Sequence, residues 1–333
     1  MDQRPVAASV EELLDGARRL GPFETAESRS DAEFELVEVD GERCVVKYLH
    51  PDLDFLLRAV DDRSCGALQV WRHGLVDLAP DCIDHAMLGA APWGRDGLGA
   101  ALLLRDVGDA LIPPGDAPIS EADHLAFLDH IAGLSAAAWD FDDTYGLLPH
   151  HKRWAWFGAD AIAEEEARGF PEAVPRIARD GWLRFAERVD GPVFEAVDSL
   201  RHDPRPLSEA ILATPQTFLH GDWKLSNLGR GADGRTVLLD WAYPGRGPVC
   251  HDLGWYIALN RSRLPVDHTK ESTVEALRAA LERHGVGTGD WWDRQLDLCL
   301  LGTLVEFGWE KALGDDDELR WWCDRAAEGI RHL

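Results

Sequence analysis

The chain has 333 residues, which is too long for one small core and sufficient for two lobes. Its 34 basic and 60 acidic residues give a formal net charge of −26. This charge disfavours binding to nucleic acid or to an anionic membrane, and it mildly favours a cationic partner. Hydrophobic residues make up 45% of the sequence and charged residues 28%, values typical of a globular protein rather than a disordered one.

Targeting signals are missing from the sequence. The first twenty residues lack the apolar core of a signal peptide, and no apolar run approaches the roughly 20 residues that span a bilayer. The six cysteines form no C-x-x-C pair, which favours free thiols in a reducing compartment. We therefore expect a cytoplasmic monomer or homodimer that binds neither nucleic acid nor membranes.

The first third of the chain is predicted to be rich in strands. In chain order, the expected elements are a short helix at 9–20, strands at 33–39 and 43–49, a helix around 53–71, and a buried strand at 100–107. Ser9 would cap the first helix. The sequence Asp-Gly-Glu joins the first two strands, and it is a strong hairpin signal.

From Ser120 onward the apolar residues recur at helical spacing. Ser120 and Asp123 form a capping-box pattern, and helical patterns cover 120–139, 164–200, 272–284 and 296–333. The exception is 217–243, where two apolar runs, TFLH and TVLLDW, flank a polar loop and a turn. We expect these two runs to form a small polar-tipped hairpin within an otherwise helical lobe.

The polar stretch FLHGDWKLSN, residues 218–227, contains the residue types that phosphoryl transfer requires. His220, Asp222 and Asn227 have the H-x-D-x-x-x-x-N spacing of a kinase catalytic loop, and Asp240 ends the next predicted strand. The reaction needs a carboxylate to orient and deprotonate the acceptor hydroxyl, and oxygen ligands to hold Mg²⁺ against the phosphates. Asp222 suits the first role, and Asn227 and Asp240 suit the second.

Together with VLLDWAYPGRGP and CHDLGWYIA, this stretch closely resembles the aminoglycoside phosphotransferase and choline kinase family, a branch of the protein-kinase-like fold. The dense part of the resemblance covers residues 218–258. It implies an α+β, bilobal fold with a small β-rich nucleotide-binding lobe at 1–105. A larger, mainly helical lobe at 106–333 would hold the catalytic and substrate-binding groups. The implied activity is Mg²⁺-dependent phosphoryl transfer from ATP or GTP.

The resemblance also implies roles for single residues: the general base is Asp222, the metal ligands are Asn227 and Asp240, and the loop supports are His220 and Asp252. An ordinary helix N-cap is an alternative role for Asp252, and it is compatible with support of the loop. Lys224 matches a lysine of Ser/Thr protein kinases that neutralises the transferring phosphate and would act as a second catalytic residue. A solvated surface lysine is the equal alternative.

In the small lobe, Lys47 within CVVKYL is implied to hold the α- and β-phosphates. The family pairs this lysine with a helix glutamate, but no Glu lies between Leu49 and Met87. We expect Asp61 or Asp62 to replace it, with Asp61 favoured because it ends the apolar run FLLRAV.

Two further segments are predicted to contact the nucleotide. ESRSDAE takes the place of a glycine-rich loop, where Ser28 and Ser30 are candidates for phosphate contact and a plain hairpin turn is the alternative. The segment LLLRDVG is the expected hinge, where the backbone of Arg105, Asp106 and Val107 would meet the purine.

The acceptor is predicted to be a small hydroxylated metabolite or antibiotic, either aminoglycoside-like or nucleoside-type, which would make antibiotic resistance one form of this activity. Glu306, Trp309 and Glu310 lie in the C-terminal stretch and combine acids with an aromatic ring, which suits a cation. The alternative is a solvated pair of helices with tryptophans in the core.

Two other functions remain open at the level of sequence. One is a nucleotide-binding pseudokinase scaffold, which the presence of Lys47, Asp222, Asn227 and Asp240 disfavours. The other is a metal hydrolase, whose ligands would be His220, Asp222, Asp240, His251 and Asp252. The spacing of these residues fits no metal-ligand pattern known to us.

Overall fold

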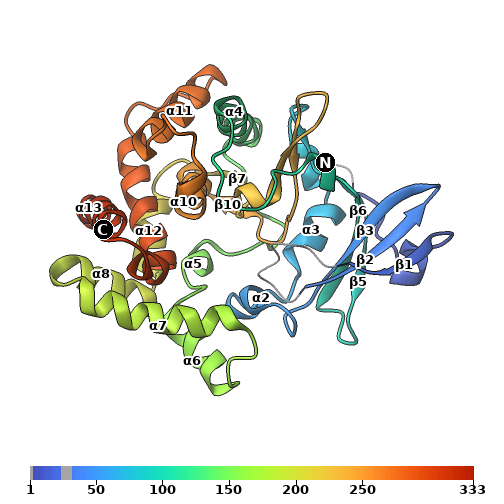
Figure 1. Ribbon diagram of the computed structural model, residues 1–333, viewed down its shortest axis with the longest axis horizontal. Helices are drawn as coiled ribbons and strands as arrows, with labels where there is room; N and C mark the ends of the chain where they lie inside the picture. The colour runs from blue at the N-terminus through green and yellow to red at the C-terminus, as the bar shows by residue number, and fades with distance from the viewer. Residues whose placement is uncertain (1–2, 24–31) are drawn as a thin grey trace.

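The computed structural model describes residues 3–23 and 32–333. The first part of the chain forms an antiparallel five-stranded sheet, and the part that follows is mainly helical (Figure 1). In spatial order the strands are β1 Arg18–Pro22, β2 Glu33–Val39, β3 Glu42–Leu49, β6 Gly99–Arg105 and β5 Met87–Trp93. The β2–β3 hairpin is confirmed: Asp40 and Gly41 both have positive φ, as a two-residue primed turn requires.

Two helix predictions in the sheet region are wrong in extent. Helix α1, Val10–Leu13, ends well before residue 20, because Gly16 adopts a φ of 76° and the chain then enters β1. The expected helix at 53–71 is two helices, α2 Phe55–Ala59 and α3 Gly66–Arg72. Asp61 and Cys65 adopt positive φ between them, which breaks the helical path.

The helical region confirms the remaining periodic patterns. Ser120 caps α4 by accepting a hydrogen bond from the Asp123 amide, as its capping pattern predicts. The helices are α4 Glu121–Ala137, α5 His150–Arg153, α6 Ala159–Ala167, α7 Ala173–Arg188, α8 Gly191–His202, α9 Arg205–Leu212, α10 Val249–Asn260, α11 Lys270–Arg283, α12 Trp292–Leu313 and α13 Asp316–Ile330. In the described part of the chain, short 3₁₀ turns lie at Leu75–Leu78, Gly108–Ala110, Leu225–Asn227 and Arg261–Arg263. Most residues of α10 and α12 are buried, so these two helices form the centre of the region.

The expected hairpin between TFLH and TVLLDW is wrong in its pairing. Strand β7, Thr217–Leu219, pairs with β10, Gly245–Gly247, and not with β9, Thr236–Leu238. Strand β9 pairs instead with β8, Leu228–Arg230, and with β4, Ile83–Asp84. The β4–β9 pairing joins the sheet region to the helical region through main-chain hydrogen bonds. None of the described helices is both long and apolar enough to cross a membrane.

Candidate active site

Asp252 on α10 binds the backbone of the loop after β7. The Asp252 carboxylate accepts hydrogen bonds from the backbone N–H of His220 at 3.2 Å and of Gly221 at 3.0 Å. Gly221 has a φ of 83°, and a Cβ there would collide with the Tyr243 carbonyl, so only glycine fits this turn. The His220 ring contacts the Leu239 carbonyl at 2.9 Å and so joins the loop to the end of β9. His220 and Asp252 therefore lie where loop supports are expected.

A buried arginine that sequence reasoning missed also lies against this loop. Arg153 donates from Nη1 to the Tyr243 carbonyl at 2.9 Å, and its guanidinium occupies the space left by the missing side chains of Gly221 and Gly245. Burial lowers the pKa of Arg153 to about 10, although Asp252 and Glu306 oppose that shift. In the sequence, Arg153 stands in the basic run HHKR, which is typical of a surface segment, and only the burial of α5 shows otherwise.

Asp222 lies inside the loop with one oxygen held and the other without a partner. Its Oδ2 accepts hydrogen bonds from Lys224 Nζ at 2.9 Å and from Asn227 Nδ2 at 2.8 Å, whereas no donor among the described residues reaches Oδ1. Burial raises the pKa of Asp222 to about 6; Lys224 opposes this shift and Asp240 adds to it. Asn227 directs its amide hydrogens to Asp222, so its amide oxygen remains as a ligand atom.

Lys47 and Asp240 bring the two regions of the chain into contact. Lys47 Nζ on β3 lies 2.6 Å from Asp240 Oδ1, just after β9, and the Lys47 side chain is buried. Burial raises the pKa of Asp240, but Lys47 and Lys224 outweigh it, so the net shift is downward. The pKa of Asp240 is therefore lowered, and its negative charge helps to raise the pKa of Asp222.

The expected pairing of Lys47 with Asp61 is wrong. Asp61 lies in the exposed break between α2 and α3, where it contacts Arg63 at 2.6 Å and Lys152 at 3.8 Å. Asp62 accepts the Gly66 amide at 2.8 Å and so helps to begin α3. Because the break turns both aspartates to other partners, neither is the acid that faces Lys47.

Asp54 is the additional carboxylate near Lys47, and sequence reasoning missed it. It is the N-cap of α2, accepts the amides of Leu56 and Leu57 at 2.8 and 3.2 Å, and is only 2% exposed. Burial raises the pKa of Asp54, Lys47 opposes that rise and Asp240 contributes to it, so the three charges interact. A capping aspartate before the apolar run FLLRA was the available signal, but the family pattern directs attention to acids within or after the helix.

The predicted nucleotide contacts are only partly described. Ser28 and Ser30 lie outside the described residues. The Arg105 side chain pairs with Asp84 and the Asp106 side chain with Arg43, so these side chains are engaged elsewhere. The amides of Arg105 and Asp106 donate to other carbonyls, whereas the Val107 amide has no acceptor within the described part of the chain. Of the three predicted hinge residues, Val107 is the one whose N–H has no acceptor in the described part of the chain.

The predicted acceptor-binding residues do not share an accessible surface. Glu306 is fully buried on α12, where Oε2 accepts from Trp255 Nε1 at 3.1 Å and Oε1 lacks a partner among the described residues. Trp309 packs on Phe157 in the core, and Glu310 reaches Lys311 at 2.6 Å. The alternative of a solvated helix pair with tryptophans in the core is right for the buried Trp309 and Trp322. It is wrong for α12 itself, which is a central helix because α7, α10 and α13 all pack on it.

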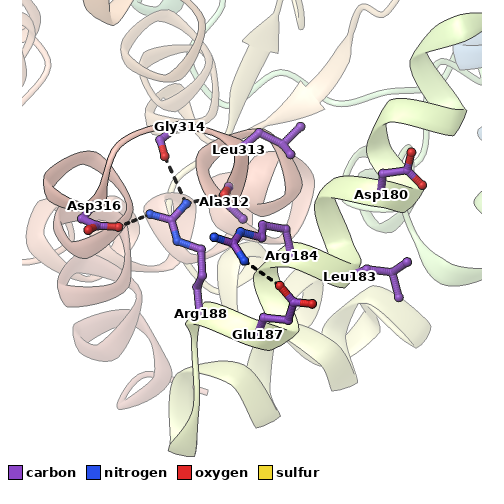
Figure 2. A pocket seen from close by; sticks show the side chains of 9 residues that line it. All are labelled: Asp180, Leu183, Arg184, Glu187, Arg188, Ala312, Leu313, Gly314 and Asp316. Atoms are coloured by element: carbon purple, nitrogen blue, oxygen red, sulfur yellow. Dashed lines mark hydrogen bonds and ion pairs between the residues drawn. The ribbon is translucent and has the colours of Figure 1, made fainter.

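A hollow of about 530 Å³ lies away from these residues, between α7 and the turn joining α12 to α13 (Figure 2). Arg188 crosses it to the Gly314 carbonyl at 3.1 Å and to Asp316, and none of the catalytic candidates lines it. Within residues 3–23 and 32–333, no group of three or more His, Cys, Asp or Glu side chains is arranged to hold a metal ion. The His251 ring packs edge-on against Trp154.

A model of the phosphotransferase enzyme family matches residues 93–291, which is more than half of the chain. The chain belongs to this family. The match confirms the resemblance to aminoglycoside phosphotransferases and choline kinases that the motifs indicate, and it makes phosphoryl transfer the reaction class. No curated protein matches the chain.

Solved structures with this phosphotransferase's fold include choline kinase LicA from Streptococcus pneumoniae. That enzyme shares 14% identity at a TM-score of 0.51, with 97% of this chain and 96% of the other covered. LicA in complex with AMP matches at 12% identity and a TM-score of 0.51, covering 96% and 92%. A thermostable mutant of aminoglycoside phosphotransferase APH(4)-Ia with ADP and hygromycin B matches at 13% identity and a TM-score of 0.47, covering 97% of both chains. The family match and the likeness to LicA confirm the predicted protein-kinase-like fold.

Proposed function

We propose that this phosphotransferase transfers the γ-phosphate of ATP or GTP to a hydroxyl of a small molecule. The observation that carries the proposal is the state of Asp222: its Oδ2 is held by Lys224 and Asn227, while Oδ1 has no partner among the described residues. A buried carboxylate oxygen without a donor is unfavourable unless a ligand supplies one. An acceptor hydroxyl would supply that donor.

The charges around Asp222 suit a general base. With a pKa raised to about 6, the carboxylate is ionised at neutral pH and still basic enough to accept a proton as the hydroxyl attacks. Lys47 is a buried cation that would stabilise charge on the phosphates, and Lys224 would hold Asp222 in place. We place the nucleotide between residues 1–105 and 106–333, with its purine at the Val107 amide.

The donor set of Asn227 and Asp240 fits Mg²⁺. Their ligand atoms are a carboxamide oxygen and a carboxylate, which are hard donors of the kind this ion prefers. When bound, the ion would neutralise charge on the β- and γ-phosphates. Asp240 now contacts Lys47, so we expect it to exchange that lysine for the ion while Asp54 stays beside the freed ammonium.

Donor and acceptor classes have unequal support. A choline kinase with this fold binds AMP, which favours an adenine nucleotide, although GTP remains to be compared. The net charge of −26 favours a cationic acceptor, such as an amino alcohol or an aminoglycoside, over a neutral nucleoside-type one.

The test is a coupled assay of ADP and GDP release with amino alcohols, aminoglycosides, nucleoside antibiotics and neutral sugars as acceptors. We expect one acceptor class to raise release well above the acceptor-free rate, and Asp222→Asn to abolish that increase. Nucleotide binding without acceptor-dependent release by any compound would favour the pseudokinase alternative.

A further inference from the structure

Helix α2 is too short to be stable by itself, so its surroundings must hold it in place. It has five residues, Phe55–Ala59, and isolated helices below about 12–15 residues are marginal in water. Figure 1 shows it between the sheet and the N-terminal end of α7. Although α2 follows β3 directly, the side chains that hold it come from the helical region.

Arg58 makes the main contact between α2 and that region. Its Nε and Nη2 donate to the two oxygens of Glu165 on α6, at 2.9 and 3.2 Å. The same Nη2 donates to Glu172, the N-cap of α7, at 2.5 Å, and Nη1 donates to the Pro51 carbonyl at 2.9 Å. Every guanidinium nitrogen is therefore used. Burial disfavours the charge on Arg58, but the two glutamates outweigh it and raise its pKa.

Both ends of α2 receive further contacts from the helical region. At its start, Glu172 accepts the Phe55 amide at 3.3 Å. At its end, Lys152 donates to the Val60 carbonyl at 2.6 Å. These contacts leave the helix little freedom to turn or slide relative to α6 and α7.

The N-terminal end of α2 carries Asp54, which lies one turn beyond β3. The Asp54 amide donates to the His50 carbonyl at 3.1 Å, and its carboxylate is buried near the Lys47–Asp240 pair. Arg58 therefore fixes one end of α2, while Asp54, at the other end, interacts electrostatically with Lys47.

We propose that Arg58 is a positioning residue for phosphoryl transfer: by fixing α2 to Glu165 and Glu172, it fixes the position of the buried Asp54 carboxylate, at the start of α2, relative to Lys47 on β3. This inference rests on the proposed function. The two buried glutamates and the largely buried arginine are weak evidence for a purely stabilising role, because a buried ion pair often contributes no more stability than an apolar contact of the same volume. A geometric role accounts better for an arginine that uses all three guanidinium nitrogens.

A double-mutant cycle tests whether Arg58 acts through Asp54. Asn is as good an N-cap as Asp, so Asp54→Asn removes the charge and keeps the helix start. We expect Arg58→Gln and Asp54→Asn each to weaken Mg·ATP binding, measured by calorimetry without acceptor, on the order of ten-fold. The double variant should be no weaker than the weaker single variant. The control is Arg63→Gln, an exposed arginine in the same segment, which should stay within about two-fold of wild type.

Additive effects of the two substitutions, or wild-type affinity in Arg58→Gln, would overturn the positioning role. If Arg58→Gln does not fold, Glu165→Gln keeps the Glu172 contact and takes its place in the cycle, with the same non-additivity expected. Failure of the wild-type protein to bind Mg·ATP would overturn the proposed function and this inference together. Binding by wild type with additive variants would overturn this inference alone.

Discussion

The catalytic loop and helix α2 both bring a buried carboxylate to the Lys47–Asp240 pair, but by different means. Asp222 is held by Lys224 and Asn227, which are two and five residues away in the chain. Helix α2, which carries Asp54, is held by glutamates 107 and 114 residues from Arg58. Short-range spacing is visible in a sequence, whereas a contact across a hundred residues depends on the packing of the whole molecule.

The largest effect should come from the loop. Asp222→Asn is expected to lower kcat by about 10²–10⁴-fold, since the amide cannot accept the hydroxyl proton. Because burial raises the pKa of Asp222 from 3.8 to about 6, the folded state loses stability as the pH rises through this interval, and the loss is complete above pH 6. The variant should therefore be at least as stable as wild type at pH 7.5 in thermal unfolding. A kcat near the wild-type value would show that Asp222 is not the general base.

The two lysines offer a sharper comparison of the two regions. Lys47→Ala should lower kcat/KM for the nucleotide by about 10²–10³-fold, because it removes a buried cation from the phosphates. Lys224→Ala should lower kcat by only about ten-fold, since its side chain is 30% exposed and solvent screens its charge. Steady-state kinetics in both substrates measures these losses. Equal losses would show that the loop lysine, too, acts directly on the phosphate.

The pH profile should report Asp222. The base is active when ionised, so kcat/KM should be constant above about pH 6 and fall about ten-fold per unit below it. Lys224 lowers the pKa of Asp222, so Lys224→Met should move this acidic limb to higher pH. Asp54→Asn should leave the limb in place, because Asp54 is not among the main charges acting on Asp222. If the acidic limb moved in Asp54→Asn and stayed in place in Lys224→Met, then Asp54 and not Lys224 would control the pKa of the base.

The smallest expected effect is thermal. Saturating Mg²⁺ should raise the unfolding temperature of the nucleotide complex, by about 2–4 °C for each kcal/mol of added binding free energy. Asp240→Ala should lose this increment because it removes the carboxylate ligand. An Asp240→Ala protein that retains the full increment would remove Asp240 from the metal site.

Much of the fold and of the loop could be predicted because the signals are local. The Asp-Gly turn between β2 and β3, the Ser120 cap and the apolar periods of the helices depend on neighbours within a few residues. The residue types at 222, 227 and 240 are those that phosphoryl transfer requires, and the spacing of these residues and His220 indicates the family. These features hold in any packing that keeps the local backbone.

Tertiary structure alone decided the rest. It paired β7 with β10, turned Asp61 outward and placed Asp54 near Lys47. It also buried Arg153 beneath the loop and Glu306 within α12. Whether a charged side chain meets water or an opposite charge depends on which distant elements pack around it. The sequence by itself determined which groups we propose for the chemistry, and the packing of α2, α5 and α12 determined which charged side chains surround them.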